Sequence, residues 1–260
     1  MICRRTWRSF AALVLAGAVA GAVWAQETAR PSDEQVKERL LYLENALRSG
    51  RPAARAWWYG WISVYGAGTV AQWSLAGAHW KDTKPVDGSP GAQRVRDRGF
   101  AEDMLVGGAT TALGLGGLLI DPFVPAYGSN ALKRLPEATP EERRTKLLRA
   151  EEILRRCAAR EKNGRGLTTH LLNIGVNAAA GIVTAAAFHR PWTDGLVTFA
   201  AGEAVSLLNI FTQPRRAIRD LREYEALVRG GGGALANAPP PGRDMYFSLS
   251  PRGISLGLRF

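Results

Sequence analysis

Four long stretches without acidic or basic side chains alternate with strongly charged ones, and this alternation constrains the fold more than any other feature. The uncharged stretches cover residues 57–80, 104–120, 167–189 and 195–212, and only Glu203 interrupts the last of them. Each stretch is rich in small residues and long enough for a helix to cross hydrocarbon, which takes about 17 to 25 residues. The sequence therefore predicts a mainly α protein, a helical bundle built from two apolar helical hairpins.

The charged stretches carry helix signals of their own. Ser32 is followed three residues later by Gln35, and Thr139 by Glu142, which is the pattern of a capping box at a helix N-terminus. Apolar residues recur behind each cap at helical spacing. We therefore expect amphipathic helices, called here the basic arms, over residues 32–48, 139–162 and 214–229. Their expected buried stripes are Val36, Leu40, Leu43 and Leu47 in the first arm and Leu147, Ala150, Leu154 and Cys157 in the second.

The order of these segments repeats along the chain. A basic arm and an apolar hairpin occupy residues 26–126, and a second arm, a second hairpin and a third basic helix occupy residues 127–229. Sliding one half along the other aligns His79 with His189. An internal duplication would leave this pattern, although glycine- and alanine-rich sequence also aligns with itself by chance.

The last part of the chain differs from the rest. Residues 230–244 are rich in glycine and proline and predict a linker, and residues 245–260 alternate apolar and polar side chains around a Pro-Arg-Gly turn. The alternation predicts a short β-hairpin. Its final strand resembles the C-terminal signal of bacterial outer-membrane barrel proteins, but no other part of the chain shows the repeated alternation that a barrel needs.

Residues 1–25 have the three parts of a secretory signal peptide. Three arginines precede an uncharged apolar run, and Val-Trp-Ala at residues 23–25 supplies the small residues of a cleavage site before Gln26. We expect an exported protein of the periplasm or outer membrane of a Gram-negative bacterium, with the inner membrane as the alternative. Cleavage would leave Cys157 as the remaining cysteine, which excludes an internal disulfide and a multi-cysteine zinc site.

The chain is strongly basic, with 34 Lys and Arg against 23 Asp and Glu and a formal net charge of +11. An exported protein is not expected to meet nucleic acid, so the basic arms indicate a membrane or another anionic envelope polymer as the partner. If the four apolar helices cross a membrane in alternation, the side that carries the arms holds most of the lysines and arginines. In an inner membrane this asymmetry places the arms in the cytoplasm, whereas a cleaved signal peptide delivers residue 26 to the periplasm. The conflict favours an envelope-associated bundle outside the inner membrane, with a soluble periplasmic bundle as an alternative.

Aromatic residues gather where the first apolar stretch meets its arm. They are Trp57, Trp58, Tyr59 and Trp61. Aromatic rings with a polar tip concentrate at membrane–water interfaces, so we interpret these residues as interface aromatics. Core packing and a platform for stacking a saccharide are the alternatives.

Small residues recur at every fourth position of two apolar stretches. They are Gly108, Ala112 and Gly116 in the second stretch, and Asn173, Asn177, Gly181 and Ala185 in the third. Such stripes let helix backbones approach closely. The first set predicts a helix contact through Gly108, Ala112 and Gly116, and faces of this kind also allow a homo-oligomer.

Glu203 is the strongest candidate for a functional side chain. A carboxylate in an apolar helix must be neutralised, paired or hydrated. Its expected partners in a buried or intramembrane polar cluster are Asn173, Asn177 and His170.

The histidines offer a weaker candidate for chemistry. If the duplication is real, His79 and His189 occupy equivalent hairpin ends and converge near Asp82 and Asp194, so His79, His189 and Glu203 are the candidate catalytic residues. Histidines at helix ends also commonly cap carbonyl groups. No metal site is expected, because only His79 has an acidic partner at short helical spacing. The motifs of nucleotide-binding, hydrolase and metalloprotease sites are absent from the sequence, so we expect no cofactor.

Two classes of function follow. The first is a non-catalytic cell-envelope protein, a membrane-associated helical bundle that acts as a scaffold or assembly component. The second is a small-molecule channel, carrier or lipid-handling enzyme centred on Glu203. The two differ in whether Glu203, Asn173 and Asn177 face one water-accessible cavity.

Overall fold

Long helices make up most of the protein in a computed structural model, which describes residues 31–87, 92–230, 244–250 and 253–259. The helices are α2 (Asp33–His79), α3 (Gly99–Ile120), α4 (Ser129–Leu132), α5 (Pro140–Asn163), α6 (Leu167–Ile182), α7 (Trp192–Thr212) and α8 (Arg216–Arg229), with a 3-10 turn η1 (Val124–Ala126) and a π-helical segment η2 (Val183–Ala187). The prediction of a mainly α helical bundle is confirmed. The predicted signal peptide, residues 1–25, and most of the predicted linker, residues 231–243, lie outside the described residues.

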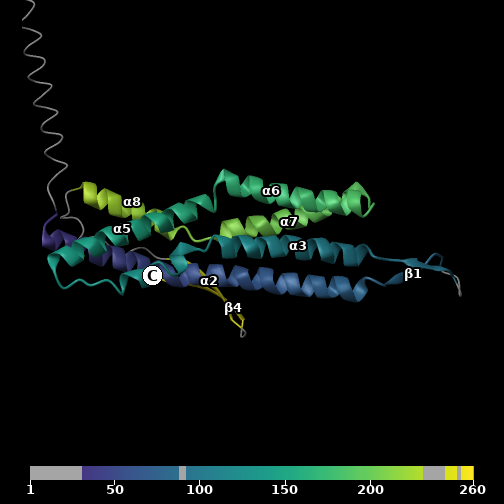
Figure 1. Ribbon diagram of the computed structural model, residues 1–260, viewed down its shortest axis with the longest axis horizontal. Helices are drawn as coiled ribbons and strands as arrows, with labels where there is room; N and C mark the ends of the chain where they lie inside the picture. The colour runs from purple at the N-terminus through teal and green to yellow at the C-terminus, as the bar shows by residue number, and fades with distance from the viewer. Residues whose placement is uncertain (1–30, 88–91, 231–243, 251–252, 260) are drawn as a thin grey trace, which may run out of the picture.

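The helices form two lobes that share α2 (Figure 1). In the hairpin lobe, residues 55–122 and 166–213, the second half of α2 packs against α3, and α6 packs against α7. In the polar lobe, residues 31–54, 123–165 and 214–230, the first half of α2 packs against α5 and α8. Helices α6, α7, α3 and the end of α2 lie at one end of the molecule and α5 and α8 at the other. The apolar and charged stretches of the sequence are thus separated in space.

The first arm and the first apolar stretch form one helix of 47 residues, α2, rather than the two helices that the charge pattern suggested. Pro52 lies inside this helix and is exposed, so its ring faces away from the packed side. The arginines and alanines around Pro52 are strong helix formers and carry the helix past it. In the second half of the chain, by contrast, α5 ends before Gly164 and α6 starts after Gly166. The internal duplication stays a prediction.

The polar lobe has a compact apolar core. The predicted stripes of the first two arms are all buried, and Leu132 of α4 with Ala217 and Tyr224 of α8 completes the cluster. Both predicted capping boxes are present: Gln35 donates its backbone N–H to Ser32 Oγ at 3.3 Å, and Glu142 donates its own to Thr139 Oγ1 at 3.2 Å. The arms are therefore held by the interactions that their sequence indicated.

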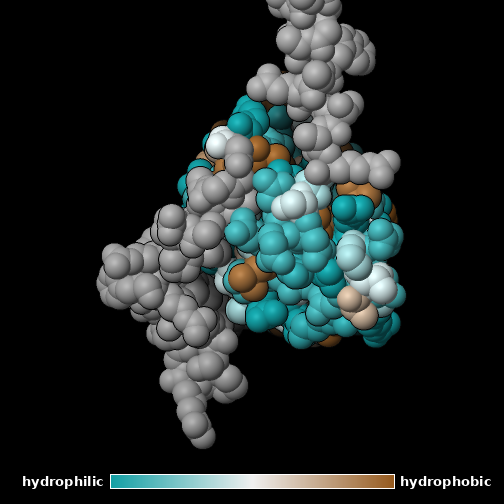
Figure 2. All heavy atoms as spheres, turned by 90° about the vertical axis from the view of Figure 1, so that its left-hand side faces the viewer, coloured by the Kyte–Doolittle hydropathy of each residue, from teal (hydrophilic) through white to brown (hydrophobic). Residues whose placement is uncertain are grey.

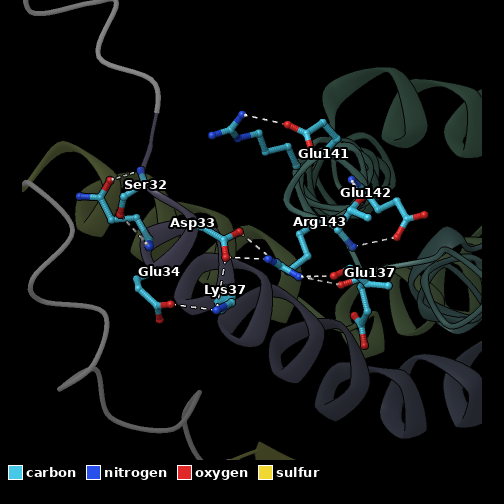
Figure 3. A network of polar contacts seen from close by, with 12 residues as sticks. Ser32, Asp33, Glu34, Lys37, Glu137, Glu141, Glu142 and Arg143 are labelled. Carbon is cyan, nitrogen blue, oxygen red and sulfur yellow. Dashed lines mark hydrogen bonds and ion pairs between the residues drawn. The ribbon is translucent and has the colours of Figure 1, made fainter.

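An ion-pair network joins the N-terminal ends of α2 and α5 (Figure 3). Arg143 of α5 donates to both carboxylate oxygens of Asp33 in α2, at 3.0 and 2.6 Å, and also to the backbone carbonyls of Glu137 and Ala138. A bidentate guanidinium–carboxylate pair fixes orientation as well as distance. Viewed from this end, the surface of the polar lobe is mainly hydrophilic (Figure 2).

Two antiparallel ribbons complete the fold. Strands β1 (Thr83–Pro85) and β2 (Arg94–Arg96) pair beyond the end of α2, at the tip of the first hairpin. Strands β3 (Asp244–Ser250) and β4 (Gly253–Arg259) pair with Ser250 opposite Gly253 and form the C-terminal β-hairpin that the sequence predicted. Strand β3 runs beside α2.

Candidate functional site

A cleft separates the two hairpins of the hairpin lobe. Its volume is about 970 Å³, and residues of α2, α3, α6 and α7 line it. Much of its wall is apolar, including Leu113, Leu172, Val176, Val197 and Val205. On α3 the lining runs from Asp103 to Asp121, almost the full length of that helix. The cleft therefore extends from one end of the lobe to the other, and we take it as the candidate site.

Arg160 closes the end of the cleft next to the polar lobe. Its Nε lies 2.9 Å from Asp121 Oδ2, and its Nη2 donates to the backbone carbonyl of Asp121 at 3.0 Å. The guanidinium also lies over the ring of Phe123, with 5.7 Å to the centroid. Asn163 and Gly164 line the cleft beside it. This end, where α3 stops, therefore has a rim formed by an arginine–aspartate ion pair.

Arg190 closes the opposite end, in the turn between α6 and α7. It donates to the carboxylates of Asp103 and Asp194, the latter at 2.9 Å, and to the carbonyl of Gly99 at 3.1 Å. Asp103 and Gly99 belong to α3, so Arg190 links the tips of the two hairpins. The cleft is thus bounded at each end by an arginine that binds the first hairpin.

The structure joins part of the predicted polar cluster around Glu203. Asn177 is buried, and its Nδ2 donates to Glu203 Oε2 at 3.0 Å and to Ser206 Oγ at 3.1 Å. Asn173 lines the cleft but does not bond to Glu203, and His170 has no hydrogen bond to the others within the part of the chain that the structure describes. Asn173 and Asn177 line the cleft, whereas Glu203 is not among its lining residues.

The closest helix contact lies between α6 and α7. A Cβ atom on Gly181 would stand 2.5 Å from the carbonyl oxygen of Gly195, and a Cβ atom on Gly195 would stand 2.5 Å from that of Gly181. Ala185 also contacts Gly195 at this crossing. Asn177, Gly181 and Ala185 belong to one stripe of the sequence, and its face meets α7 as the spacing indicated. The sequence did not single out Gly195, because its partner stripe on α7 is interrupted by larger residues.

The predicted contact through Gly108, Ala112 and Gly116 is only partly present. Gly108 is buried against Trp73 of α2, whose ring would lie 2.2 Å from an added Cβ atom. Gly116 was wrongly assigned to the same contact, because among the described residues no atom of another helix lies within 4 Å of its Cβ position. The reason is geometric: the face that meets α2 follows Gly107, Thr111 and Gly114 instead, and the every-fourth-residue stripe turns away from it. Ala112 is half-buried.

The predicted interface aromatics sit at the boundary between the lobes, and three of them use their indole N–H groups at helix ends. Trp57 donates to the carbonyl of Asn209 at 3.3 Å, and Trp61 donates to Thr212 Oγ1 at 3.1 Å, both near the end of α7. Trp58 donates to the carbonyl of Leu118 at 3.3 Å, near the end of α3. The last carbonyls of a helix have no partner within it, so Trp57 and Trp58 satisfy acceptors that the helices leave open, whereas Trp61 binds a side-chain hydroxyl.

Burial differs among these aromatic residues. Trp57 is buried and packs against Phe123, with ring centroids 4.8 Å apart, so core packing accounts for this side chain. Trp58 and Trp61 are half-buried, and Tyr59 is half exposed beneath the guanidinium of Arg55. These four side chains of α2, called here the aromatic belt, lie together at the junction of the lobes.

The histidines do not form the predicted acid/base pair. His79 Nδ1 lies 2.7 Å from Asp82 Oδ2, but Asp194 binds Arg190 rather than His189. A guanidinium is always charged and matches the planar geometry of a carboxylate, so it outcompetes an imidazole for that partner. His189 is exposed and has a φ of 56°, the left-handed conformation that ends many helices. Its role is to turn the chain after η2.

Two buried acids of the polar lobe carry no signal in the sequence. Glu161 and Asp220 are each 1% exposed, and burial raises the pKa of Glu161 to about 7 and that of Asp220 to about 6. Both lie in charged helices where a carboxylate is usually solvated, so no sequence signal separated them from their neighbours. Burial also raises the pKa of the Cys157 thiol to about 12, which makes it a packing residue rather than a nucleophile at neutral pH.

In the part of the chain that the structure describes, three helical segments are apolar and long enough to cross a membrane, judged by length and composition. They are Gly99–Ile120, Leu167–Ala187 and Trp192–Arg229, and only 17%, 28% and 11% of their apolar windows are buried. Among the described residues, no group of three His, Cys, Asp or Glu side chains is placed to hold a metal ion. Comparison of the chain with protein-family models, curated proteins and solved structures finds no match.

Proposed function

We propose that this protein is a non-catalytic cell-envelope protein whose hairpin lobe lies in a lipid membrane and whose basic polar lobe stays at one face of that membrane as a scaffold. The exposed apolar surface carries the proposal. Large apolar side chains are exposed on every helix of the hairpin lobe, among them Val70, Leu113, Ile120, Leu172, Trp192, Val197 and Phe211. In the described part of the polar lobe, the comparable side chains are Leu41, Tyr127 and Leu148. An apolar surface of this extent on one lobe is typical of a lipid or protein interface.

The aromatic belt supports a membrane boundary at the junction of the lobes. Trp58, Tyr59 and Trp61 lie where the apolar helices end, and the indole N–H groups of Trp58 and Trp61 donate to the carbonyl of Leu118 and to Thr212 Oγ1. Tryptophan and tyrosine prefer the headgroup level of a bilayer, since one part of each ring is apolar and the other polar. The belt would therefore place the polar lobe directly above the lipid headgroups.

The charge of the polar lobe supports an anionic partner at that face. Most of the 34 lysines and arginines belong to the arms and the tail. The exposed ones include Arg149, Arg155 and Arg156 on the outer side of α5, which also pair with Glu151 or Glu152 of the same helix. Anionic lipid attracts such a surface by about 1 kcal/mol for each nearby basic side chain. A cell-wall polymer offers the same chemistry.

The compartment follows from the predicted signal peptide. Export at residues 1–25 and the basic arms together favour the periplasm or outer membrane of a Gram-negative bacterium over the inner membrane. A channel or carrier centred on Glu203 has less support, because Glu203 does not line the cleft and its carboxylate is already bonded to Asn177.

Fractionation tests the proposal. Membranes from cells that make the full chain are washed with high salt and then with carbonate, and the protein should remain in the pellet after both. Val70→Arg places a charge in the middle of the exposed apolar surface of α2 and should weaken retention, because a central arginine costs about 2.5 to 3.5 kcal/mol in a spanning helix. Leu148→Arg, equally exposed on the polar lobe, is the matched control and should be retained. Release of the wild type by salt alone would refute the membrane assignment.

A further inference from the structure

We propose that the cleft between the two hairpins binds one phospholipid, with its anionic headgroup at Arg160 and an acyl chain along the apolar wall. This inference rests on the proposed function, since it names the ligand that the hairpin lobe would take from the membrane. Three observations support it: the shape of the cleft, the charge at one of its ends and the hydrogen bonding of its polar side chains.

The dimensions of the cleft suit a lipid. A volume of about 970 Å³ is near the upper end of the range of about 300 to 1,000 Å³ for small-molecule sites. At 1.5 Å per residue, the lining on α3 from Asp103 to Asp121 is about 27 Å long. That length is close to the hydrocarbon thickness of a bilayer, about 30 Å. A cleft of this length in a membrane must be filled by acyl chain, and apolar side chains such as Leu113, Val197 and Val205 are suited to contact it.

The two ends of the cleft differ in charge, which sets the orientation of the lipid. Arg190 at the tip binds two carboxylates, Asp103 and Asp194, so that end carries no excess of positive charge. Arg160 binds one carboxylate, and Arg165, which donates to the carbonyls of Phe211 and Gln213, brings a second positive charge to this end. A phosphate group is therefore favoured at the end next to the polar lobe.

Backbone geometry supports the same end. Helix α6 begins at Leu167 with Gly166 as its N-cap and no side-chain cap, and Thr169 in its first turn lines the cleft. A helix N-terminus presents free N–H groups and partial positive charge, which favour an anion nearby. Asn163, also at this end, lines the cleft beside Arg160.

The polar groups of the wall leave one donor where a glycerol ester would lie. Thr111 and Asn177 face the cleft but are hydrogen-bonded within the chain, to Thr69 and to Glu203. Asn209 also lines the cleft, and its Nδ2 has no hydrogen-bond partner among the described residues. Asn209 lies three residues before the end of α7, about 4.5 Å below the rim. Ester carbonyls of a phospholipid lie at that depth beneath the phosphate, and they accept hydrogen bonds.

Native mass spectrometry of the full chain, extracted in mild detergent and exchanged with phosphatidylglycerol or phosphatidylcholine of equal chain length, tests the proposal. We expect one phosphatidylglycerol per chain. Ala201→Trp fills the cleft and should abolish the bound lipid, whereas Ala204→Trp, exposed on the same helix outside the cleft, should keep it. Circular dichroism melting checks that both variants fold.

A second pair of variants tests the headgroup. Arg160→Gln should lower the preference for phosphatidylglycerol over phosphatidylcholine by about fivefold, the equivalent of about 1 kcal/mol per near-surface charge. Arg156→Gln, one turn away and exposed, should leave the preference unchanged. If Ala201→Trp retains lipid as Ala204→Trp does, or if the wild type carries none, the cleft assignment is wrong.

The two proposals fail in different ways. Membrane retention after carbonate without bound lipid overturns the cleft assignment alone. Release of the wild type from membranes overturns the proposed function, and short-chain phosphatidylglycerol added to the released protein then decides whether the cleft binds lipid.

Discussion

The carboxylate of Glu161 in α5 accepts a hydrogen bond from the backbone N–H of Ile218 in α8, with 3.1 Å between the two atoms. Helix α8 has no side-chain cap of its own, since Arg215 occupies the N-cap position. Glu161 therefore caps α8 from another helix and supplies negative charge where the helix dipole is positive. This contact holds the third basic arm against the second.

Glu161 should make the polar lobe less stable as pH rises through the slightly acidic range. Its pKa is about 7 in the folded chain, above the ordinary 4.5, because burial disfavours the charged form. The folded state thus binds more protons than the unfolded state between those values, so the free energy of unfolding falls as pH rises from about 4.5 to 7. The loss is on the order of 3 kcal/mol. Melting temperatures measured by circular dichroism from pH 4.5 to 8 check this slope.

Glu161→Gln should reduce that slope, most clearly between pH 6 and 7, because glutamine does not titrate and its carbonyl still accepts from Ile218. Asp220, whose pKa burial raises to about 6, should keep part of the slope below pH 6 in both proteins. Glu152→Gln, on the exposed side of the same helix, is the control and should melt with the wild-type slope. An unchanged slope in Glu161→Gln would show that another group causes the pH dependence.

Gly195→Ala should destabilise the α6–α7 hairpin. The new methyl group would stand 2.5 Å from the backbone carbonyl of Gly181, and backbone at a helix crossing cannot yield without separating the helices. Overpacking of this kind costs about 1 to 3 kcal/mol. Thermal unfolding in detergent measures the loss.

Gly116→Ala in α3 is the matched control and should not destabilise the protein. The Cβ position there is open, and alanine is favoured over glycine inside a helix by about 0.5 to 1 kcal/mol, so stability should be unchanged or slightly higher. Equal destabilisation by Gly195→Ala and Gly116→Ala would mean that the tight crossing is not at Gly195.

Glu203→Gln should leave the fold intact. Asn177 Nδ2 donates to Glu203 Oε2, and a glutamine carbonyl accepts the same hydrogen bond without a charge to desolvate. Asn177→Leu should be the harmful change, since it removes the bonds to Glu203 and Ser206, at a cost of about 1 to 3 kcal/mol. Unfolding curves of the two variants distinguish these outcomes. If Glu203→Gln fails to fold, the negative charge of Glu203 is required for stability and the prediction is wrong.

The basic arms should bind anionic vesicles through charge. At low salt the protein should bind phosphatidylglycerol vesicles more tightly than phosphatidylcholine vesicles. Raising the salt concentration should reduce this difference in affinity, because salt screens exposed charges over a distance of about 10 Å at 0.1 M. Sedimentation of the protein with vesicles of each lipid at increasing salt concentrations measures this difference in affinity. Equal binding to both lipids at every salt concentration would leave the arms without an electrostatic role.

The mature protein should begin at Gln26. Val-Trp-Ala at residues 23–25 places small residues where signal peptidase reads them. N-terminal sequencing of the protein from the cell envelope gives the answer directly, and a chain that still begins with Met1 would contradict cleavage.

Local patterns determined much of this architecture. Ser32 and Gln35, or Thr139 and Glu142, form their capping boxes from neighbours three residues apart, so sequence alone was sufficient to predict them. The apolar stripe at Val36 and Leu147 and the alternation around the C-terminal turn likewise depend on periods of 3.6 and 2. Patterns of this kind depend only on residues that are close in sequence, so they can be predicted without the tertiary structure.

Tertiary structure decided which residues of each pattern are used. The helix of α2 continues through Pro52 because packing on both lobes outweighs one lost hydrogen bond. Gly181 contacts Gly195, whereas no atom of another described helix lies within 4 Å of the Cβ position of Gly116. The reason is that the rotation of each helix about its axis depends on the helices packed against it and not on the spacing of small residues in the sequence. The burial of Glu161 and the pairing of Asp194 with Arg190 instead of His189 have the same cause. Both depend on residues that are remote in sequence and come together only when the chain is folded.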